Sequence, residues 1–195
     1  MFNSVVRRCF YQEPVENDDD EKLRKTTFAG EEKINSDTLI DTHGAYVVAP
    51  RNVAHRLNVP FVDATKITHD IETELGIEGS RKLHMWFRPG ECSQIPKGRQ
   101  DNTHYNVYGA RLVANALADE IGKQVPELKK HVRHYDYVVS TRGRGNYFTL
   151  QDAVDAVPAG KRVKVLVLDG SWKKPENLKG KKIKFILLFG AKITD

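Results

Sequence analysis

An aspartate and a histidine that stand three residues apart, Asp101 and His104, are the residues of this chain best suited to catalysis. A serine hydroxyl attacks an ester only when a base removes its proton, and a neutral histidine can be that base near neutral pH. A carboxylate beside the histidine selects the ring tautomer and stabilises the imidazolium that forms. The pair therefore suits a hydrolase. The competing interpretation is a helix cap followed by a surface histidine.

A helix is expected directly after this pair. Five apolar residues recur at spacings of three and four, so they share one helical face. They are Val107, Ala110, Ala114, Leu117 and Ile121. Asn106 is a good N-cap because its side-chain oxygen can accept a hydrogen bond from a first-turn amide. The pattern predicts that Asp101 and His104 lie on the loop that enters the helix, where a rigid scaffold often holds catalytic side chains.

Residues on either side of this aspartate are candidates for substrate binding. Trp86, Phe87 and Arg88 are expected in a loop upstream of it. An aromatic ring beside a guanidinium can stack on a sugar ring and pair with a uronate carboxylate. The alternative is that Trp86 and Phe87 belong to the core. Asn102, next to Asp101, is a further candidate.

Several separated blocks of sequence resemble the C-terminal half of SGNH (GDSL-type) hydrolases. Of that group, the rhamnogalacturonan acetylesterase-like carbohydrate esterases are the most similar. The resemblance covers residues 3 to 128. The blocks, in chain order, are Arg7–Phe10, Asp41–Gly44, Val59–Asp63, Leu83–Glu91 and Asp101–Arg111.

This resemblance implies a Ser-His-Asp esterase. His104 would be the general base and then the general acid, and Asp101 would orient it. The family's Gly-Asp-Ser nucleophile block does not occur in the chain, so we expect the nucleophile and oxyanion donors to lie in sequence outside it. No serine stands in a strand–loop–helix nucleophile setting; the serines are Ser4, Ser36, Ser80, Ser93, Ser140 and Ser171. The chain alone is predicted to be inactive.

The first part of the chain reads as alternating strands and helices. Residues 4–10 and 59–62 are expected to be strands, and residues 48–57 and 63–75 helices, with Gly76 as the stop of the second. The polar stretch 13–36, with its acidic run 16–21, is expected to be a solvated loop. The order predicts an α/β fold in which helices cover both faces of a parallel sheet. With the resemblance, this implies part of a flavodoxin-like three-layer SGNH fold over residues 1–130.

The character of the sequence changes near residues 129–134, where we place a domain boundary. Strands are expected at 135–139, 163–168 and 183–188, and a short helix at 150–157 capped by Thr149. Residues 136–158 resemble the opening of pectinesterases, which implies the first coils of a right-handed parallel β-helix over 135–195. The segment Gly170–Lys174 departs from that family's pattern. No catalytic residue of that family can be placed on this chain.

The composition of the chain argues against a membrane-spanning protein and against a nucleic-acid-binding protein. The chain has 195 residues, of which 39% are hydrophobic, and no apolar run reaches the roughly 18 residues that span a membrane. The net charge is +5 with lysines crowded toward the C-terminus, but no pattern of a nucleic-acid-binding motif accompanies it. The lysines are expected on a solvated face, with attraction to anionic pectin as a weaker alternative. No partner besides a pectic polysaccharide is predicted, and the sequence does not indicate an oligomeric state.

Cysteine and histidine usage gives no metal or cofactor prediction. Cys9 and Cys92 are expected to be unrelated free thiols, and no Cys-x-x-Cys occurs. A metal site formed by Asp101, His104 and His43 is the alternative to a catalytic pair, and we expect no metal. The first ten residues do not form a signal peptide. The resemblance nevertheless implies a secreted or periplasmic parent protein.

The predicted function is hydrolysis of acetyl esters on a pectic polysaccharide, rhamnogalacturonan. Two alternatives remain open. The C-terminal part could remove methyl esters from pectin, or the protein could bind polysaccharide without catalysis.

Overall fold

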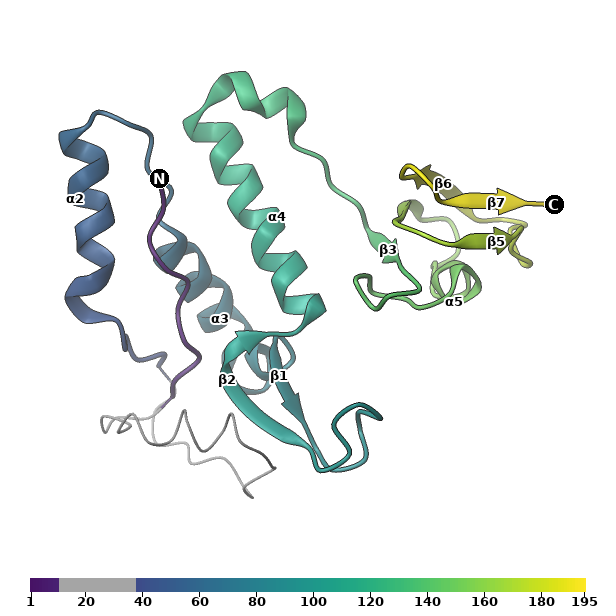
Figure 1. Cartoon of the computed structure of the whole chain (residues 1–195), viewed down its shortest axis with the longest axis horizontal. Helices are drawn as coiled ribbons and strands as arrows, with labels where there is room; N and C mark the ends of the chain where they lie inside the picture. Colours follow the sequence, from purple (N-terminus) through teal and green to yellow (C-terminus); the bar gives the residue numbers. More distant parts are fainter. Residues whose placement is uncertain (11–37) are drawn as a thin grey trace. The chain divides into compact units, whose positions relative to one another are not determined.

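The structure, a computed structural model, describes residues 1–10 and 38–195. The chain divides into two compact units, Met1–Val132 and Arg133–Asp195 (Figure 1). The division lies within the 129–134 stretch. The predicted acidic loop and Ser36 lie outside the described residues. No helix in the described part of the chain is long and apolar enough to cross a membrane.

Among the described residues of the first unit, two 3-10 helices and three α-helices are formed, and α4 begins directly after its predicted cap, Asn106. They are the 3-10 helices η1 (Gly44–Val47) and η2 (Pro126–His131) and the α-helices α2 (Val48–Arg56), α3 (Ala64–Arg81) and α4 (Val107–Gln124). Asp63 caps α3 by accepting from the Lys66 amide, and Asn106 caps α4 by accepting from the Gly109 amide. At Gly76, the predicted stop, the glycine has φ 65° and is not helical, so α3 consists of two helical stretches joined by a kink. Only glycine adopts that conformation without strain.

The face that α4 buries differs from the one predicted, and α3 buries several polar residues. Helix α3 buries Ala64, Thr68, Glu72 and Ser80, whereas its apolar residue Leu75 is exposed. Helix α4 buries Gly109, Val113 and Gly122, and Val107, Ala110 and Ala114 are exposed. The reason is that polar groups on α3 have partners inside the unit, so their burial costs little. The spacing of apolar residues along the sequence does not reveal those partners.

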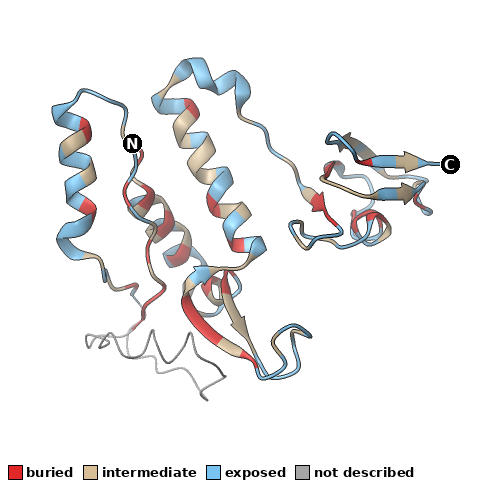
Figure 2. Ribbon diagram, viewed as in Figure 1, coloured by how far each residue is buried: buried red, intermediate tan, exposed pale blue. Residues whose placement is uncertain are grey.

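The predicted parallel strands of the first unit are wrong in the described residues. Residues 4–10 form no strand, and residues 59–62 contribute only the parallel bridge between Phe2 and Val62. The chain after Phe2 is nevertheless buried at Val6, Cys9 and Phe10 (Figure 2). Its backbone groups bond to three separate segments: the Val6 amide donates to Thr68 Oγ1, the Arg8 amide to the Asn102 carbonyl, and the Ile40 amide to the Cys9 carbonyl. No single strand beside it supplies a ladder.

The sheet of the first unit is an antiparallel pair, β1 (His84–Phe87) and β2 (Arg99–Tyr105). Two predictions are corrected by it. Trp86 and Phe87 lie in β1 and not in a loop, and Asp101 and His104 lie in β2 and not on the loop that enters α4. Asn106 links α4 to β1, because its Nδ2 donates to the Lys82 and His84 carbonyls, 2.8 and 2.9 Å away. The start of α4 is thereby fixed to the start of β1.

The second unit is built from parallel strands. It contains β3 (Tyr137–Val139), α5 (Leu150–Asp155), β4 (Arg162–Val167), β5 (Ser171–Lys173), β6 (Lys182–Leu187) and β7 (Lys192–Thr194). The strands form one parallel sheet in the order β3-β4-β6 and a second parallel pair, β5-β7. Lys164 and Lys184 face solvent between buried or half-buried apolar neighbours, and Thr149 caps α5. The predicted strands and helix therefore form, and β5 and β7 are additional.

The pairing in this unit repeats along the chain. Arg162 of β4 pairs with Lys182 of β6, and Ser171 of β5 pairs with Lys192 of β7. Each strand therefore lies beside the strand that follows it by about one repeat of twenty residues. The core is formed by Val139, Leu150, Ala153, Val157, Val163, Val165, Val167 and Ala191.

Candidate active site

A bulge in β2 brings Asp101 and His104 together. In a regular strand, residues three apart point to opposite faces, with Cα atoms about 10 Å apart. Here the neighbouring residues His84 and Met85 of β1 pair with Tyr105 and Asp101 of β2, which are four residues apart. The intervening residues of β2 are bulged out, and such bulges often re-aim side chains at functional sites.

The bulge is closed by the Asp101 side chain. Its Oδ1 accepts from the backbone amides of Thr103 and His104, each at 2.9 Å. Its Oδ2 lies 2.9 Å from His104 Nδ1. An aspartate that binds the amides two and three residues on is a common way to form a tight turn. The same carboxylate therefore shapes the chain and contacts the ring.

The two side chains differ sharply in exposure. Asp101 is 4% exposed and the His104 side chain 58%. Among the described residues, Asp101 is the one side-chain hydrogen-bond partner of His104. With Nδ1 directed at the carboxylate, Nε2 is the ring nitrogen left to act on a substrate.

The environment of Asp101 favours its ionised form. Burial alone would raise the pKa of this carboxyl, but the amides of His104 and Thr103 and the His104 ring hold the pKa below its ordinary value of 3.8. Arg99 adds a positive charge, with its Nε 3.6 Å from Asp101 Oδ2. At neutral pH the pair is thus a carboxylate that accepts from an imidazole, the arrangement that orients a general base.

Asn102 points into the protein. It is 6% exposed, and its Oδ1 accepts from Arg8 Nη1 at 2.9 Å. Arg8 is fully buried, and it also donates to Ser80 Oγ and to the Ile77 carbonyl. These bonds tie the bulge to the N-terminal segment and to the end of α3. The contact of the Asn102 side chain with Arg8 is therefore structural, and its contact with substrate stays a prediction.

Trp86 and Arg88 differ in exposure and in their surroundings. Trp86 is half-buried in β1, and the Arg81 guanidinium lies 4.3 Å from the centre of its ring. Arg88 is exposed, in the turn that follows β1. One face of the indole is thus already occupied by a cation, as in other cation–π pairs. Of the two, Arg88 is the more accessible to a ligand.

A second histidine–carboxylate pair was missed by the sequence analysis. His84 Nε2 lies 2.8 Å from Glu72 Oε1, and both side chains are fully buried. The Tyr105 hydroxyl donates to the same oxygen at 3.1 Å. Burial and the Glu72 carboxylate raise the pKa of Tyr105 above its ordinary value of 10.0. With no exposed atom, this pair joins α3 to the sheet and does not act on a substrate; no spacing in the sequence marks it.

The remaining candidates do not join the pair. Within residues 1–10 and 38–195, no three His, Cys, Asp or Glu side chains are grouped so that they could hold a metal ion. The His43 amide donates to Asp41 Oδ1, at the entrance to η1. Ser80 and Ser140 are buried, bonded to Arg8 and to Asp169 respectively. Cys9 and Cys92 are free thiols.

Comparison with known proteins supports one of the two resemblances. Part of the chain is similar to a rhamnogalacturonan acetylesterase. The relative is rhamnogalacturonan acetylesterase RhgT of Bacillus subtilis (strain 168), with 36% identity over 91 residues. The match covers 47% of this chain but only 39% of that protein, so the chain spans less than half the length of the relative.

Two further comparisons gave no match. No protein-family model matches the chain. No solved structure matches it either. The resemblance to pectinesterases therefore stays a prediction. The chain accordingly contains a region like a carbohydrate esterase, in agreement with the resemblance seen in the sequence.

Proposed function

We propose that the protein to which this chain belongs hydrolyses acetyl esters on rhamnogalacturonan, with His104 as general base and Asp101 as the residue that orients it. The observation that carries the proposal is the 2.9 Å contact between a buried, ionised Asp101 and the Nδ1 atom of an exposed His104. The similarity to a rhamnogalacturonan acetylesterase supplies the substrate class.

The chemical steps follow from this geometry. Because Nδ1–H donates to Asp101, Nε2 carries the lone pair that removes the proton from a serine hydroxyl. The serine oxygen forms a bond to the acetyl carbon, and the sugar oxygen leaves with the proton that His104 returns. Water then attacks the acetyl-serine while His104 takes the proton of the water and returns it to serine. Acetate leaves, and the enzyme is restored.

The proposal takes the nucleophile from sequence outside these 195 residues. The sequence contains no Gly-Asp-Ser tripeptide. His104 has no serine partner among the described residues. The chain also covers only 39% of the relative's length. Together these support an active site completed by a segment that precedes this chain, in an SGNH-type fold that the chain forms in part.

The test begins with the encoding DNA, where a Gly-Asp-Ser block is expected upstream. Protein that includes the block should release acetate from acetylated rhamnogalacturonan, whereas the 195-residue chain alone should not exceed the buffer background. If the longer protein releases no acetate from this polymer but does so from acetylated xylan, the substrate class is wrong. If the chain alone turns over either polymer, the assignment of the nucleophile is wrong.

We also propose that residues 135–195 form the first coils of a parallel β-helix. The support is the pairing of β4 with β6 and of β5 with β7, in which each strand lies parallel to its counterpart one repeat later. Such a stack needs about three repeats to bury its core. Limited proteolysis tests this: longer protein with further repeats should resist cleavage in residues 182–195 better than this chain does.

A further inference from the structure

The buried pair Glu72–His84 and the hydroxyl of Tyr105 form a polar network beside the strand that carries His104. Both contacts end on a single atom, because Glu72 Oε1 lies 2.8 Å from His84 Nε2 and accepts from the Tyr105 hydroxyl at 3.1 Å. The His84 and Tyr105 rings also lie against each other, with their centres 4.7 Å apart. One carboxylate oxygen of α3 therefore fixes a residue of β1 and a residue of β2.

The two residues that this network fixes stand at one end of the bulge. His84 pairs with Tyr105, and the register shifts directly beyond that pair. Tyr105 follows His104 in the chain, and adjacent residues of a strand point to opposite faces. The Tyr105 side chain is accordingly half-buried, whereas that of His104 is 58% exposed. Holding Tyr105 inside the unit therefore directs His104 outward.

The other end of the bulge is held by different contacts. There Asn102 accepts from Arg8, and Asp101 accepts from two backbone amides of the bulge. These contacts place the Asp101 carboxylate, whereas the network of Glu72 places the residue next to His104. The two sets of contacts together set the separation between the carboxylate and the ring.

The network is a costly way to fill buried space. Among the described residues, Glu72 Oε2 and His84 Nδ1 are buried and have no hydrogen-bond partner. A buried polar atom without a partner costs free energy, and apolar residues in place of a buried ion pair are often equally stable or more stable. Stability is therefore a weak explanation for this network, and a fixed geometry next to His104 is a better one.

We propose that Glu72 and Tyr105 are positioning residues for His104. The bond from the Tyr105 hydroxyl to Glu72 holds β2 against α3, so that His104 Nδ1 stays within reach of Asp101. Neither residue would touch the substrate, because both act from inside the unit. The role rests on the proposed function, in which His104 is the general base, but the geometry behind it can be measured without catalysis.

The test is nitrogen-15 spectroscopy of the imidazole rings in the full chain with Tyr105→Phe, which removes only the hydroxyl. The neutral His104 ring should shift from the Nδ1–H form toward the Nε2–H form, because its contact with Asp101 is loosened. Glu72→Gln should give a smaller shift in the same direction, since an amide oxygen still accepts from the hydroxyl but more weakly than a carboxylate.

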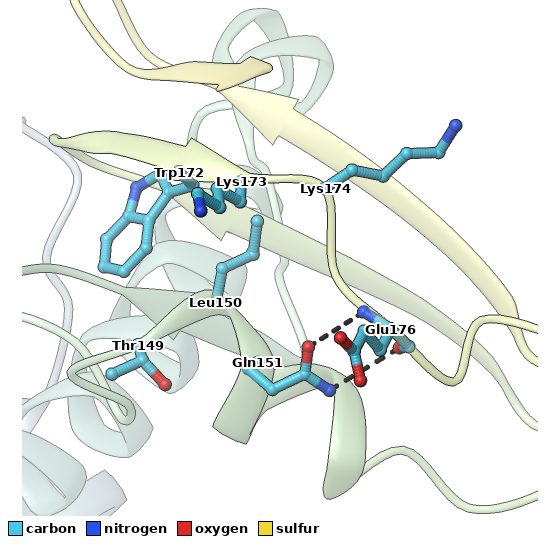
Figure 3. Close-up of a pocket in the computed structure, with 7 residues that line it drawn as sticks. All are labelled: Thr149, Leu150, Gln151, Trp172, Lys173, Lys174 and Glu176. Atoms are coloured by element: carbon cyan, nitrogen blue, oxygen red, sulfur yellow. Dashed lines mark hydrogen bonds between the residues drawn. The ribbon is translucent and has the colours of Figure 1, made fainter. Parts of the chain in front are cut away.

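Two controls separate positioning from a general loss of stability. Leu39→Ala opens a cavity in a buried cluster of the same unit that contains no residue of the network. Gln151→Ala removes a side chain that lines a hollow of the second unit and bonds to Glu176 there (Figure 3). Both variants should leave the His104 spectrum unchanged.

Acetate release by a longer protein with the proposed Gly-Asp-Ser block gives a second readout. Tyr105→Phe should lower kcat about tenfold and leave KM nearly unchanged, because a displaced catalytic group slows the reaction without weakening binding. If the wild-type longer protein releases no acetate but Tyr105→Phe still shifts the His104 tautomer, the proposed function is wrong and the positioning role holds.

Two outcomes overturn the proposal. Unchanged His104 spectra in folded Tyr105→Phe and Glu72→Gln mean that the network supports only the fold. An equal shift in Leu39→Ala means that any loss of stability disturbs the ring. If Tyr105→Phe does not fold, Glu72→Gln carries the test by itself, and a wild-type spectrum for that variant overturns the proposal.

Discussion

At the scale of single residues, one carboxylate has two roles. Asp101 closes the bulge of β2 through the amides of Thr103 and His104, and it also contacts His104 Nδ1. A shift of Asp101 would therefore move both the ring and the backbone that carries it. This coupling explains how two residues of a strand form a pair that strand geometry alone would keep apart.

The first prediction concerns the tautomer of His104. Asp101→Asn should move the neutral ring from the Nδ1–H form toward the Nε2–H form, because an amide can donate to Nδ1 where the carboxylate accepts from it. Nitrogen-15 correlation spectra of the imidazole measure the two forms directly. Glu74→Gln, which alters an exposed carboxylate on α3, is the control and should leave the His104 signals unchanged. Identical spectra for wild type and Asp101→Asn would contradict the assigned contact.

The second prediction concerns pH and stability. The pKa of Asp101 is lowered in the folded state, so its ionised form stabilises the fold above its ordinary pKa of 3.8. That contribution is lost as pH falls through the lower, folded value. The difference in unfolding free energy between wild type and Asp101→Asn should be constant near neutral pH and shrink below 3.8. Urea unfolding across this range measures it, and a difference that persists into strong acid would contradict the assignment.

At the scale of elements, the start of α4 depends on one glycine. A Cβ at Gly109 would stand 2.1 Å from the Leu83 carbonyl oxygen, which is backbone and cannot rotate away. The backbone amide of Asn106 donates to that same carbonyl at 2.8 Å, so α4 and the start of β1 approach each other closely here. The contact fixes α4 to β1, the partner strand of the bulge that carries His104.

The third prediction follows from this contact. Gly109→Ala should destabilise the first unit by about 1–3 kcal/mol, the cost of forcing an extra methyl into a packed site. Tyr108→Ala, in the same helical turn but exposed, should change stability by less than about 0.5 kcal/mol. Chemical denaturation of both variants provides the measurement. Equal stabilities for the two variants would mean that α4 does not pack on Leu83 as described.

The sequence predicted where helices begin better than it predicted which residues pack against them. The predicted caps Asn106 and Thr149, and the helices after them, depend on local hydrogen bonds, which a short stretch of sequence can predict. The burial of Thr68 and Glu72 depends on Val6, His84 and Tyr105, which are distant in sequence. The Asp101–His104 pair was predicted from residue type, but not the bulge, because that depends on the register with β1.

At the scale of the whole molecule, two units with separate cores share one chain. The core of the second unit is made entirely of its own residues, from Val139 to Ala191. The buried cluster of Val6, Phe10 and Leu39 belongs to the first. Units with separate cores usually fold separately.

The fourth prediction is that the units unfold independently. Val165→Ala removes methyl groups from a fully buried position and should destabilise the second unit by about 2 kcal/mol while leaving the first unchanged. Hydrogen-exchange mass spectrometry reports the two units separately. Faster exchange confined to residues 133–195 is expected. Equal acceleration in α3 and α4 would show that the chain unfolds as one cooperative unit.

The central claim is that His104 is the general base of an acetylesterase. Acetate release from acetylated rhamnogalacturonan, by a longer protein that contains this chain together with the proposed Gly-Asp-Ser block, tests it most directly. His104→Ala should lower kcat by about 10⁴-fold or more, as loss of a triad member does. His55→Ala, an exposed histidine of α2, should retain wild-type activity. Near-normal acetate release by folded His104→Ala would contradict the claim.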